Sequence, residues 1–297
     1  GYLESIPQRA TYAERLTEIW DYAKYSAPFR EGERTFFTKN DGLQNQSVLY
    51  VQESPQGEPR VLLDPNRLSA DGTVSLGGLS ISRDGRYLAW STSTSGSDWR
   101  EWYVRDITTG ADLEDKITWS KFSDANWDHD SLGFYYSRYD APVDGETFEG
   151  ANYNQKLYYH RVGTPQSDDT LIYQRPDEKE WGYTSCVSED GRYLVISVWQ
   201  GTSHNSRVLY KDLRDKNRII RELLMDNDAD YTFVGNDGPL FFFKTDKNAP
   251  RKRIIGINVA QPEPASWQEI VPESADPMDG ATIVDNRFVL KYMHDVK

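Results

Sequence analysis

Cysteine is almost absent from this 297-residue chain, which contains only Cys186. One cysteine cannot form an intrachain disulfide, and it excludes every metal site that needs several thiolates. We interpret Cys186, which lies between Ser185 and Val187, as a small buried hydrophobic residue. Such low cysteine usage fits a reducing compartment, so we expect a cytoplasmic protein.

Basic residues and long apolar runs are also scarce. The chain has 34 Lys and Arg against 47 Asp and Glu, which gives a net charge of -13. This balance argues against a nucleic-acid groove and an anionic membrane surface, because both attract clustered Lys and Arg. No apolar run approaches the roughly 20 residues that a membrane-spanning helix needs. We therefore expect neither nucleic acid nor a membrane as a partner.

Signatures of catalysis and of metal binding are missing from the sequence. No Gly-x-Ser-x-Gly elbow is present, since "GLSIS" (78–82) and "GTSHN" (201–205) both lack the last glycine. The acidic stretch "DNDADY" (226–231) lacks the glycine and terminal glutamate of a calcium loop. The histidines are scattered and form no metal or base motif: His129, His160, His204 and His294. We assign no catalytic residue, no metal and no cofactor to this chain.

Aromatic residues are plentiful, with nine Trp, nineteen Tyr and eleven Phe. They recur in short clusters bounded by Gly, Asp, Asn and Pro, a pattern typical of strands and turns. One stretch, "TYAERLTEIWDYA" (11–23), predicts a helix instead. Thr11 and Glu14 form a capping-box pattern there, and Leu16, Ile19 and Trp20 share one helical face.

A turn motif recurs along the chain, most clearly as "SRDGRYL" (82–88) and "SEDGRYL" (188–194). Asp and Gly favour a tight turn, because Asp bonds locally and Gly accepts positive φ. The sialidase Asp box is excluded, since Asp84 and Gly85 are adjacent. The acidic turn position returns about every fifty residues: Glu31, Asp84, Asp130, Asp190, Asp237 and Asp285. We therefore interpret the motif as scaffold.

Each turn but the last is followed by two strands that form a hairpin, as in "RYLVISV" (192–198) and "RVLYKDLR" (207–214). Three or four strands per fifty residues predict a β-propeller blade. The rival fold, an array of β-sandwiches, needs a period near roughly 100 residues. We predict an all-β fold, a β-propeller of five blades plus the start of a sixth, with a short N-terminal helical segment. The approximate blade boundaries are 25–70, 71–115, 116–175, 176–225, 226–275 and 276–297.

Several strings, in order along nearly the whole chain, closely resemble the prolyl oligopeptidase family of serine peptidases. The resemblance rests on "WDYAKYS", "GLQNQSVLYVQES", "VLLDPNRLSADGTVSL", "SGSDWREW", "QKLYYHRVGT", "PDEKEWGYTSCVSEDGRYL" and "YMHDVK". It implies an α/β-hydrolase domain with Ser, Asp and His, capped by a seven-bladed propeller. Residues 1–24 would end an N-terminal segment of the absent hydrolase domain, and residues 25–297 would be part of the propeller. We expect both ends of the chain to be cuts in a longer protein.

The resemblance also implies a function. The family's propeller covers the active site and admits only short peptides, which the enzyme cleaves on the carboxyl side of proline. The expected partners are short proline-containing peptides and the hydrolase domain of the same protein, in a monomer. The isolated chain is expected to be inactive, because it lacks the triad.

Four residues match positions that contact substrate or gate access in the family. Phe122 in "KFSDANW" and Arg207 in "SRVLYKDL" are predicted to bind substrate. Asp98 in "SGSDW" is predicted at the interface with the hydrolase domain, and Gln155 in "YNQKLYYH" near a mobile loop over the entrance. The alternatives are that Phe122 belongs to a blade core and that Arg207 is a hairpin surface residue.

The chain departs from the family pattern at two positions. Gly182 stands where relatives often carry Met, which predicts a roomier pocket, and Lys211 stands where relatives can carry a reactive Cys. Two other functions stay open from the residues alone. One is a stand-alone interaction propeller of the TolB-like or WD-repeat type, and the other is a carbohydrate-active propeller.

Overall fold

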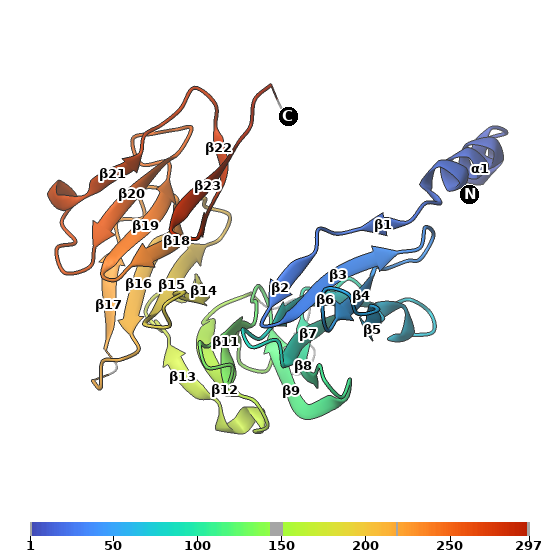
Figure 1. The fold of residues 1–297 in the computed structure, drawn as a ribbon, viewed down its shortest axis with the longest axis horizontal. Helices are drawn as coiled ribbons and strands as arrows, with labels where there is room; N and C mark the ends of the chain where they lie inside the picture. The colour runs from blue at the N-terminus through green and yellow to red at the C-terminus, as the bar shows by residue number, and fades with distance from the viewer. Residues whose placement is uncertain (1, 143–150, 218, 296–297) are drawn as a thin grey trace. The chain divides into compact units, whose positions relative to one another are not determined.

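The computed structural model of this chain describes residues 2–142, 151–217 and 219–295. Their regular structure consists of antiparallel strands, one α-helix and four short 3-10 helices (Figure 1). The chain divides into two compact units, unit 1 at residues 1–118 and unit 2 at residues 119–297. Across the described ranges, no helix has the length and apolar character to cross a membrane. The prediction of an all-β fold with one N-terminal helix is confirmed.

The N-terminal helix α1 (Arg9–Trp20) begins earlier than the sequence predicts. Its N-cap is Gln8, which already has helical backbone angles and makes no capping bond with its side chain. Thr11 therefore lies inside the helix, whereas a capping hydroxyl needs an extended backbone. The predicted capping box of Thr11 and Glu14 is wrong for this reason.

The apolar face of α1 is open to solvent. Leu16, Ile19 and Trp20 lie on it, and 59%, 48% and 62% of their surfaces are exposed. No residue of this helix is buried. The predicted helix is present, but burial of these apolar residues does not stabilise it in this structure.

Unit 1 contains two antiparallel sheets, with the 3-10 helices η1 (Tyr2–Ser5) and η2 (Pro65–Arg67). The first sheet comprises β1 (Lys24–Tyr25), β2 (Phe29–Glu31), β3 (Arg34–Asn40), β4 (Val48–Gln52) and β5 (Arg60–Leu63). The second comprises β6 (Val74–Ile81), β7 (Tyr87–Thr94), β8 (Arg100–Asp106) and β9 (Asp112–Ser120), which belong to an eight-stranded sheet completed by four strands that follow in the chain. Strand β9 runs two residues past the unit boundary. Their facing side chains form one core, which includes Phe36, Leu49, Leu88 and Trp90.

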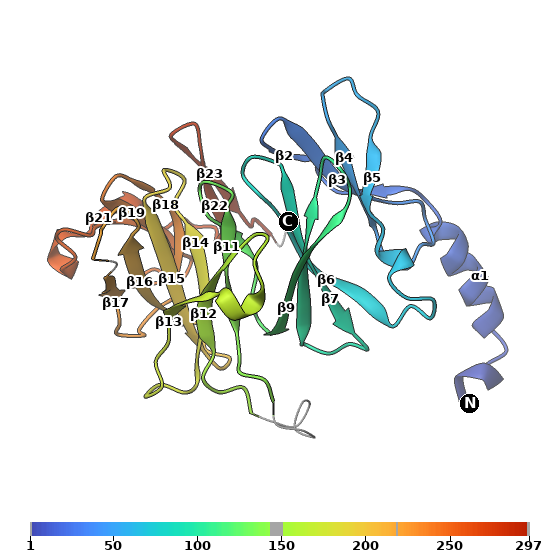
Figure 2. The ribbon, with the colours of Figure 1, turned by 90° about the horizontal axis from the view of Figure 1, so that it is seen from below.

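Unit 2 contains three four-stranded antiparallel groups and one hairpin, with η3 (Gln166–Asp168) and η4 (Pro264–Ser266) (Figure 2). The first group is β10 (Asn126–Trp127), β11 (Gly133–Arg138), β12 (Lys156–Arg161) and β13 (Thr170–Tyr173). The second is β14 (Trp181–Val187), β15 (Tyr193–Gln200), β16 (Arg207–Asp212) and β17 (Ile220–Leu224). The third is β18 (Tyr231–Asp237), β19 (Leu240–Thr245), β20 (Arg253–Asn258) and β21 (Gln268–Val271), and the hairpin is β22 (Met278–Val284) with β23 (Arg287–Tyr292).

Strand β15 shows why so many of these strands are apolar on both faces. Leu194 and Ile196 point into the core shared with β11 and β12, whereas Tyr193 and Val195 point into the core shared with β19 and β20. A strand covered on both faces has a nearly continuous apolar sequence. Four-stranded antiparallel sheets stacked face to face match the predicted propeller blades. The approximate blade boundaries stay predictions.

The two copies of the Ser-x-Asp-Gly-Arg-Tyr-Leu motif form the same turn. In each copy the serine hydroxyl donates to the aspartate, at 2.6 Å, and accepts from the backbone N–H of the tyrosine, at 2.8 Å for Ser82 and 2.9 Å for Ser188. The aspartate also accepts from the backbone N–H of the arginine, and the glycine donates to the serine carbonyl. Gly85 and Gly191 have φ of 71° and 67°, which glycine adopts without strain. Both copies are therefore tight turns, as the sequence predicts, and their interpretation as scaffold stays a prediction.

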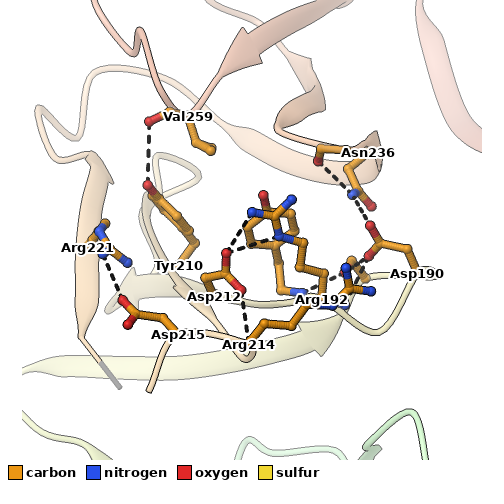
Figure 3. A network of polar contacts seen from close by, with 12 residues as sticks. Asp190, Arg192, Tyr210, Asp212, Arg214, Asp215, Arg221, Asn236 and Val259 are labelled. Atoms are coloured by element: carbon orange, nitrogen blue, oxygen red, sulfur yellow. Dashed lines mark hydrogen bonds and ion pairs between the residues drawn. The ribbon is translucent and has the colours of Figure 1, made fainter. Parts of the chain in front are cut away.

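The second copy is also joined to its surroundings by polar contacts (Figure 3). Arg192 donates to Asp212, with 2.9 Å between Nη2 and Oδ2, and Asn236 of β18 donates to Asp190 at 3.2 Å. Burial opposes ionisation of Asp190, but the hydrogen bonds from Ser188, Arg192 and Asn236 outweigh it and lower the pKa of this carboxyl. The turn therefore connects the sheet of β14–β17 to the next sheet along the chain.

Candidate functional site

A cavity of about 1060 Å³ in unit 2 is the strongest candidate for a binding site. Three aromatic residues, Phe122, Tyr153 and Trp199, form its apolar lining. The remaining lining is mostly amide and hydroxyl side chains, with one carboxylate: Asn152, Glu180, Gln200, Thr202, Ser203 and Asn227, together with Gly201. Aromatic surfaces beside hydrogen-bonding groups are typical of sites that bind small organic molecules or peptides.

Phe122 is held in a conformation that a phenylalanine rarely adopts. Its φ is 54°, in the left-handed region, and 41% of its surface is exposed. Its ring meets the ring of Trp199 edge to face, with 5.8 Å between centroids and an interplanar angle of 90°. The Nζ of Lys121 lies 5.2 Å from the centroid of the same ring. The alternative of a blade-core residue does not fit this exposure, whereas a cavity wall does.

Gln155 fixes the backbone on which Phe122 stands. It is 1% exposed, and its Nε2 donates to the carbonyl of Lys121 at 2.8 Å. Its Oε1 accepts from the backbone N–H of Tyr183 at 2.6 Å. Both ends of the amide are therefore satisfied by backbone groups far apart in sequence. The structure makes Gln155 a buried support of the cavity edge, and its predicted role in gating stays a prediction.

Gly182 does not widen the pocket, so that prediction is wrong. Gly182 of β14 is the cross-strand partner of Trp199 on β15. A Cβ atom built on Gly182 would lie 2.0 Å from Cζ2 of Trp199. The indole ring thus occupies the space that a larger residue at position 182 would need. Sequence reasoning missed Trp199, because only the strand register shows that it faces a glycine.

Arg207 begins β16 and does not line this cavity. Its guanidinium stacks over the ring of Trp181, 4.8 Å from the centroid, and Arg175 stacks on the same ring at 4.9 Å. The Nη1 of Arg207 is buried and finds no hydrogen-bond acceptor among the described residues. An unsatisfied buried donor is costly, so this nitrogen would gain from an acceptor supplied by a ligand. The structure does not bring Arg207 and Phe122 into one cavity.

Asp98 lies in unit 1, exposed, in the turn between β7 and β8. Its predicted place at an interface with a hydrolase domain stays a prediction. Lys211 lies on β16 and lines a second cavity of unit 2, of about 570 Å³, with Tyr135, Tyr159 and Lys216. Over the described part of the chain, no group of His, Cys, Asp and Glu could hold a metal ion.

A buried polar chain that joins β11 and β12 to the residue after η3 also escaped sequence reasoning. His160 Nδ1 lies 2.7 Å from Asp169 Oδ1, with both side chains fully buried, and the hydroxyl of Tyr136 donates to Asp169 Oδ2 at 2.6 Å. Burial, and then the Asp169 carboxylate, raise the pKa of Tyr136. None of these residues lines the cavity of Phe122, so we interpret the chain as structural.

Comparison with known proteins identifies the relatives of this chain. The family model described as "Prolyl oligopeptidase, N-terminal beta-propeller domain" matches residues 1–297. The prolyl endopeptidase of Elizabethkingia miricola is 39% identical over 277 residues, covering 93% of this chain and 39% of that protein. The prolyl endopeptidase of Elizabethkingia meningoseptica is 37% identical over 294 residues, covering 99% of this chain and 41% of that protein.

A solved structure is similar as well. Prolyl oligopeptidase B from Galerina marginata, bound to a 35mer hydrolysis and macrocyclization substrate, superposes with a TM-score of 0.91 at 30% identity. The match covers 99% of this chain and 44% of that one. The chain therefore spans about two fifths of the length of these relatives. The comparisons confirm the predicted propeller and favour the peptidase interpretation over a stand-alone interaction propeller.

Proposed function

This chain belongs to the prolyl oligopeptidase N-terminal β-propeller family, and from that premise we propose that it selects and gates substrates for a serine endopeptidase. The proposed enzyme cleaves short peptides on the carboxyl side of proline. The match of the family model over residues 1–297 carries this proposal. The catalytic Ser, Asp and His would belong to an α/β-hydrolase domain of the same protein, acting with an oxyanion hole.

The cavity of unit 2 supports a role in peptide binding. Phe122 and Trp199 offer ring surfaces for a side chain, and the neighbouring amide and hydroxyl groups offer partners for a peptide backbone. The exposed apolar face of α1 supports a partner for the N-terminal segment, because exposed apolar patches favour docking. We propose that this partner is the hydrolase domain.

The remaining features of the proposal follow from composition and from the family. The expected substrates are short proline-containing peptides, and the expected state is a cytoplasmic monomer. We propose that the 297-residue chain by itself is inactive, because its sequence holds no Gly-x-Ser-x-Gly elbow.

The test compares the 297-residue chain with a full-length protein that carries it, both assayed on a fluorogenic Gly-Pro peptide. The full-length protein should release the fluorophore, and a variant of its nucleophilic serine should not. The purified chain should give no turnover above buffer. A full-length protein without prolyl activity would overturn the proposed function, and turnover by the chain alone would overturn its proposed inactivity.

A further inference from the structure

The indole of Trp199 packs directly over a glycine of the neighbouring strand. Gly182 and Trp199 face each other across β14 and β15. Gly182 is buried, and the indole lies so close that an added Cβ would approach Cζ2, Cε2 and Cη2 at 2.0, 2.1 and 2.6 Å. An aromatic ring that covers a cross-strand glycine replaces the packing that the glycine cannot supply. The glycine thus determines where the indole can lie.

The indole so placed becomes one wall of the cavity. Trp199 is partly exposed and lines the cavity, while Phe122 abuts it at 90°. Phe122 is in turn held from below by Gln155 through the carbonyl of Lys121. Two rings at a right angle, both fixed from behind, form a corner rather than a flat surface. Such a corner accepts a planar group that stacks on one ring and meets the edge of the other.

The charges around the corner indicate an uncharged occupant. Lys121 already lies over the ring of Phe122, and Lys179 lies over the ring of Tyr153 at 4.3 Å. These ammonium groups disfavour a cationic side chain by like-charge repulsion. Glu180, the one carboxylate among the lining residues, accepts from Gln200 at 3.2 Å and disfavours an anionic side chain. Apolar rings with charges of both signs at the rim therefore suit a neutral planar side chain.

We propose that Trp199, held in place by Gly182, is a specificity-determining residue that selects peptides carrying a planar apolar side chain. The inference rests on the proposed function, since it names the substrate side chain that the cavity recognises. Trp199 contacts the substrate side chain, and Gly182 acts through Trp199 as a positioning residue. Any side chain at position 182 displaces the indole and so weakens the same preference.

The test uses the full-length protein and fluorogenic Gly-Pro peptides in which one phenylalanine, or one alanine, stands at each upstream position in turn. For the wild type, phenylalanine at one position should lower KM about tenfold relative to alanine. Trp199→Ala and Gly182→Ala should each abolish that difference in KM. The double variant should behave like Trp199→Ala, because the glycine acts only through the indole. Trp267→Ala, a part-buried tryptophan on another cavity, is the matched control and should keep the preference.

Titration calorimetry with the same peptides separates failure of this inference from failure of the proposed function. A wild type that cleaves no prolyl peptide would overturn the proposed function, and the calorimetric preference for phenylalanine would still decide the inference. If the losses of phenylalanine preference in the two single variants add in the double variant, Gly182 and Trp199 act independently, and this result would overturn the inference. A preference that survives Trp199→Ala in a folded protein, as judged by its thermal midpoint, would overturn it as well.

Discussion

The two Ser-x-Asp-Gly-Arg-Tyr-Leu turns, one in each unit, make the same internal hydrogen bonds but meet different neighbours. In unit 1, a Cβ on Gly85 would lie 2.5 Å from the carbonyl oxygen of Glu31, a backbone atom. In unit 2, a Cβ on Gly191 would lie 2.5 Å from the ring of His129, a half-exposed side chain. The two copies therefore have the same local structure but should differ in how far a substitution of their glycine destabilises the protein.

Alanine substitution of Gly85 and of Gly191 should lower the free energy of unfolding by different amounts, and this is the largest difference that we expect. Gly191→Ala should cost about 2 kcal/mol, because the left-handed backbone is strained and His129 on an exposed turn, whose Cβ would lie 2.7 Å from the added Cβ, must shift. Gly85→Ala should cost about 3 kcal/mol, because it must also move a backbone carbonyl of the neighbouring turn. Urea unfolding of both variants measures the difference. Equal losses would show that the neighbours do not matter.

Each turn is held by hydrogen bonds among its own residues, whereas the edge of the cavity is held by the side chain of Gln155, which bonds distant backbone groups. Gln155→Ala should lower the free energy of unfolding by about 2–3 kcal/mol, because the buried N–H of Tyr183 loses its acceptor and the part-buried carbonyl of Lys121 loses one donor. The KM for peptides that fill the cavity should rise as well. A loss below 1 kcal/mol would contradict the role of Gln155 as a support.

The free energy of unfolding of Gln155→Glu should depend on pH, which tests the same two hydrogen bonds. An ionised glutamate can accept from Tyr183 but cannot donate to the carbonyl of Lys121, whereas a protonated one can do both. Folding should therefore raise the pKa of this glutamate. The variant should gain stability relative to Gln155→Ala as the pH falls toward about 4, where glutamate protonates in the unfolded chain. A difference that does not change with pH would contradict the hydrogen-bond geometry.

Substitution of Phe122 tests function rather than stability. Phe122→Ala in the full-length protein should raise KM about tenfold and change kcat less, since the ring binds substrate without taking part in the reaction. Phe122→Gly is the matched control for the backbone, because glycine adopts the φ of 54° freely. It should be more stable than Phe122→Ala and have an equally high KM. An unchanged KM in both variants would contradict the pocket assignment.

The smallest effect concerns the charge of the second turn. The pKa of Asp190 is lowered, so the stability that it contributes is present above the pKa of an unfolded aspartate, about 3.9, and is lost as the pH falls through the lower folded value. Asp190→Asn should therefore make unfolding less dependent on pH in this acid range. Ser188→Ala, which removes a donor to the same carboxylate, should reduce the dependence in part. Acid titrations followed by circular dichroism measure both slopes.

The sequence predicted the repeated parts of this molecule better than the unique ones. The turn positions, the paired strands and the propeller follow from local chemistry that recurs every fifty residues, so each copy supports the others. The capping box failed because the backbone is already helical at Gln8. The cavity was predicted through Phe122 alone. Trp199 and the contacts of Gln155 depend on register and on packing between distant strands, which a single sequence does not display.

We propose that the repeated turns are scaffold, whereas the corner of Phe122 and Trp199 binds the substrate. The most direct measurement is the KM of the full-length protein for a phenylalanine-containing prolyl peptide, compared between Trp199→Ala and Asp190→Ala, alongside the thermal midpoint of each. We expect Trp199→Ala to raise KM about tenfold with little change in kcat, and Asp190→Ala to lower the midpoint while KM stays constant. The reverse pattern, with KM changed by Asp190→Ala and not by Trp199→Ala, would show that the turn and not the corner binds the substrate.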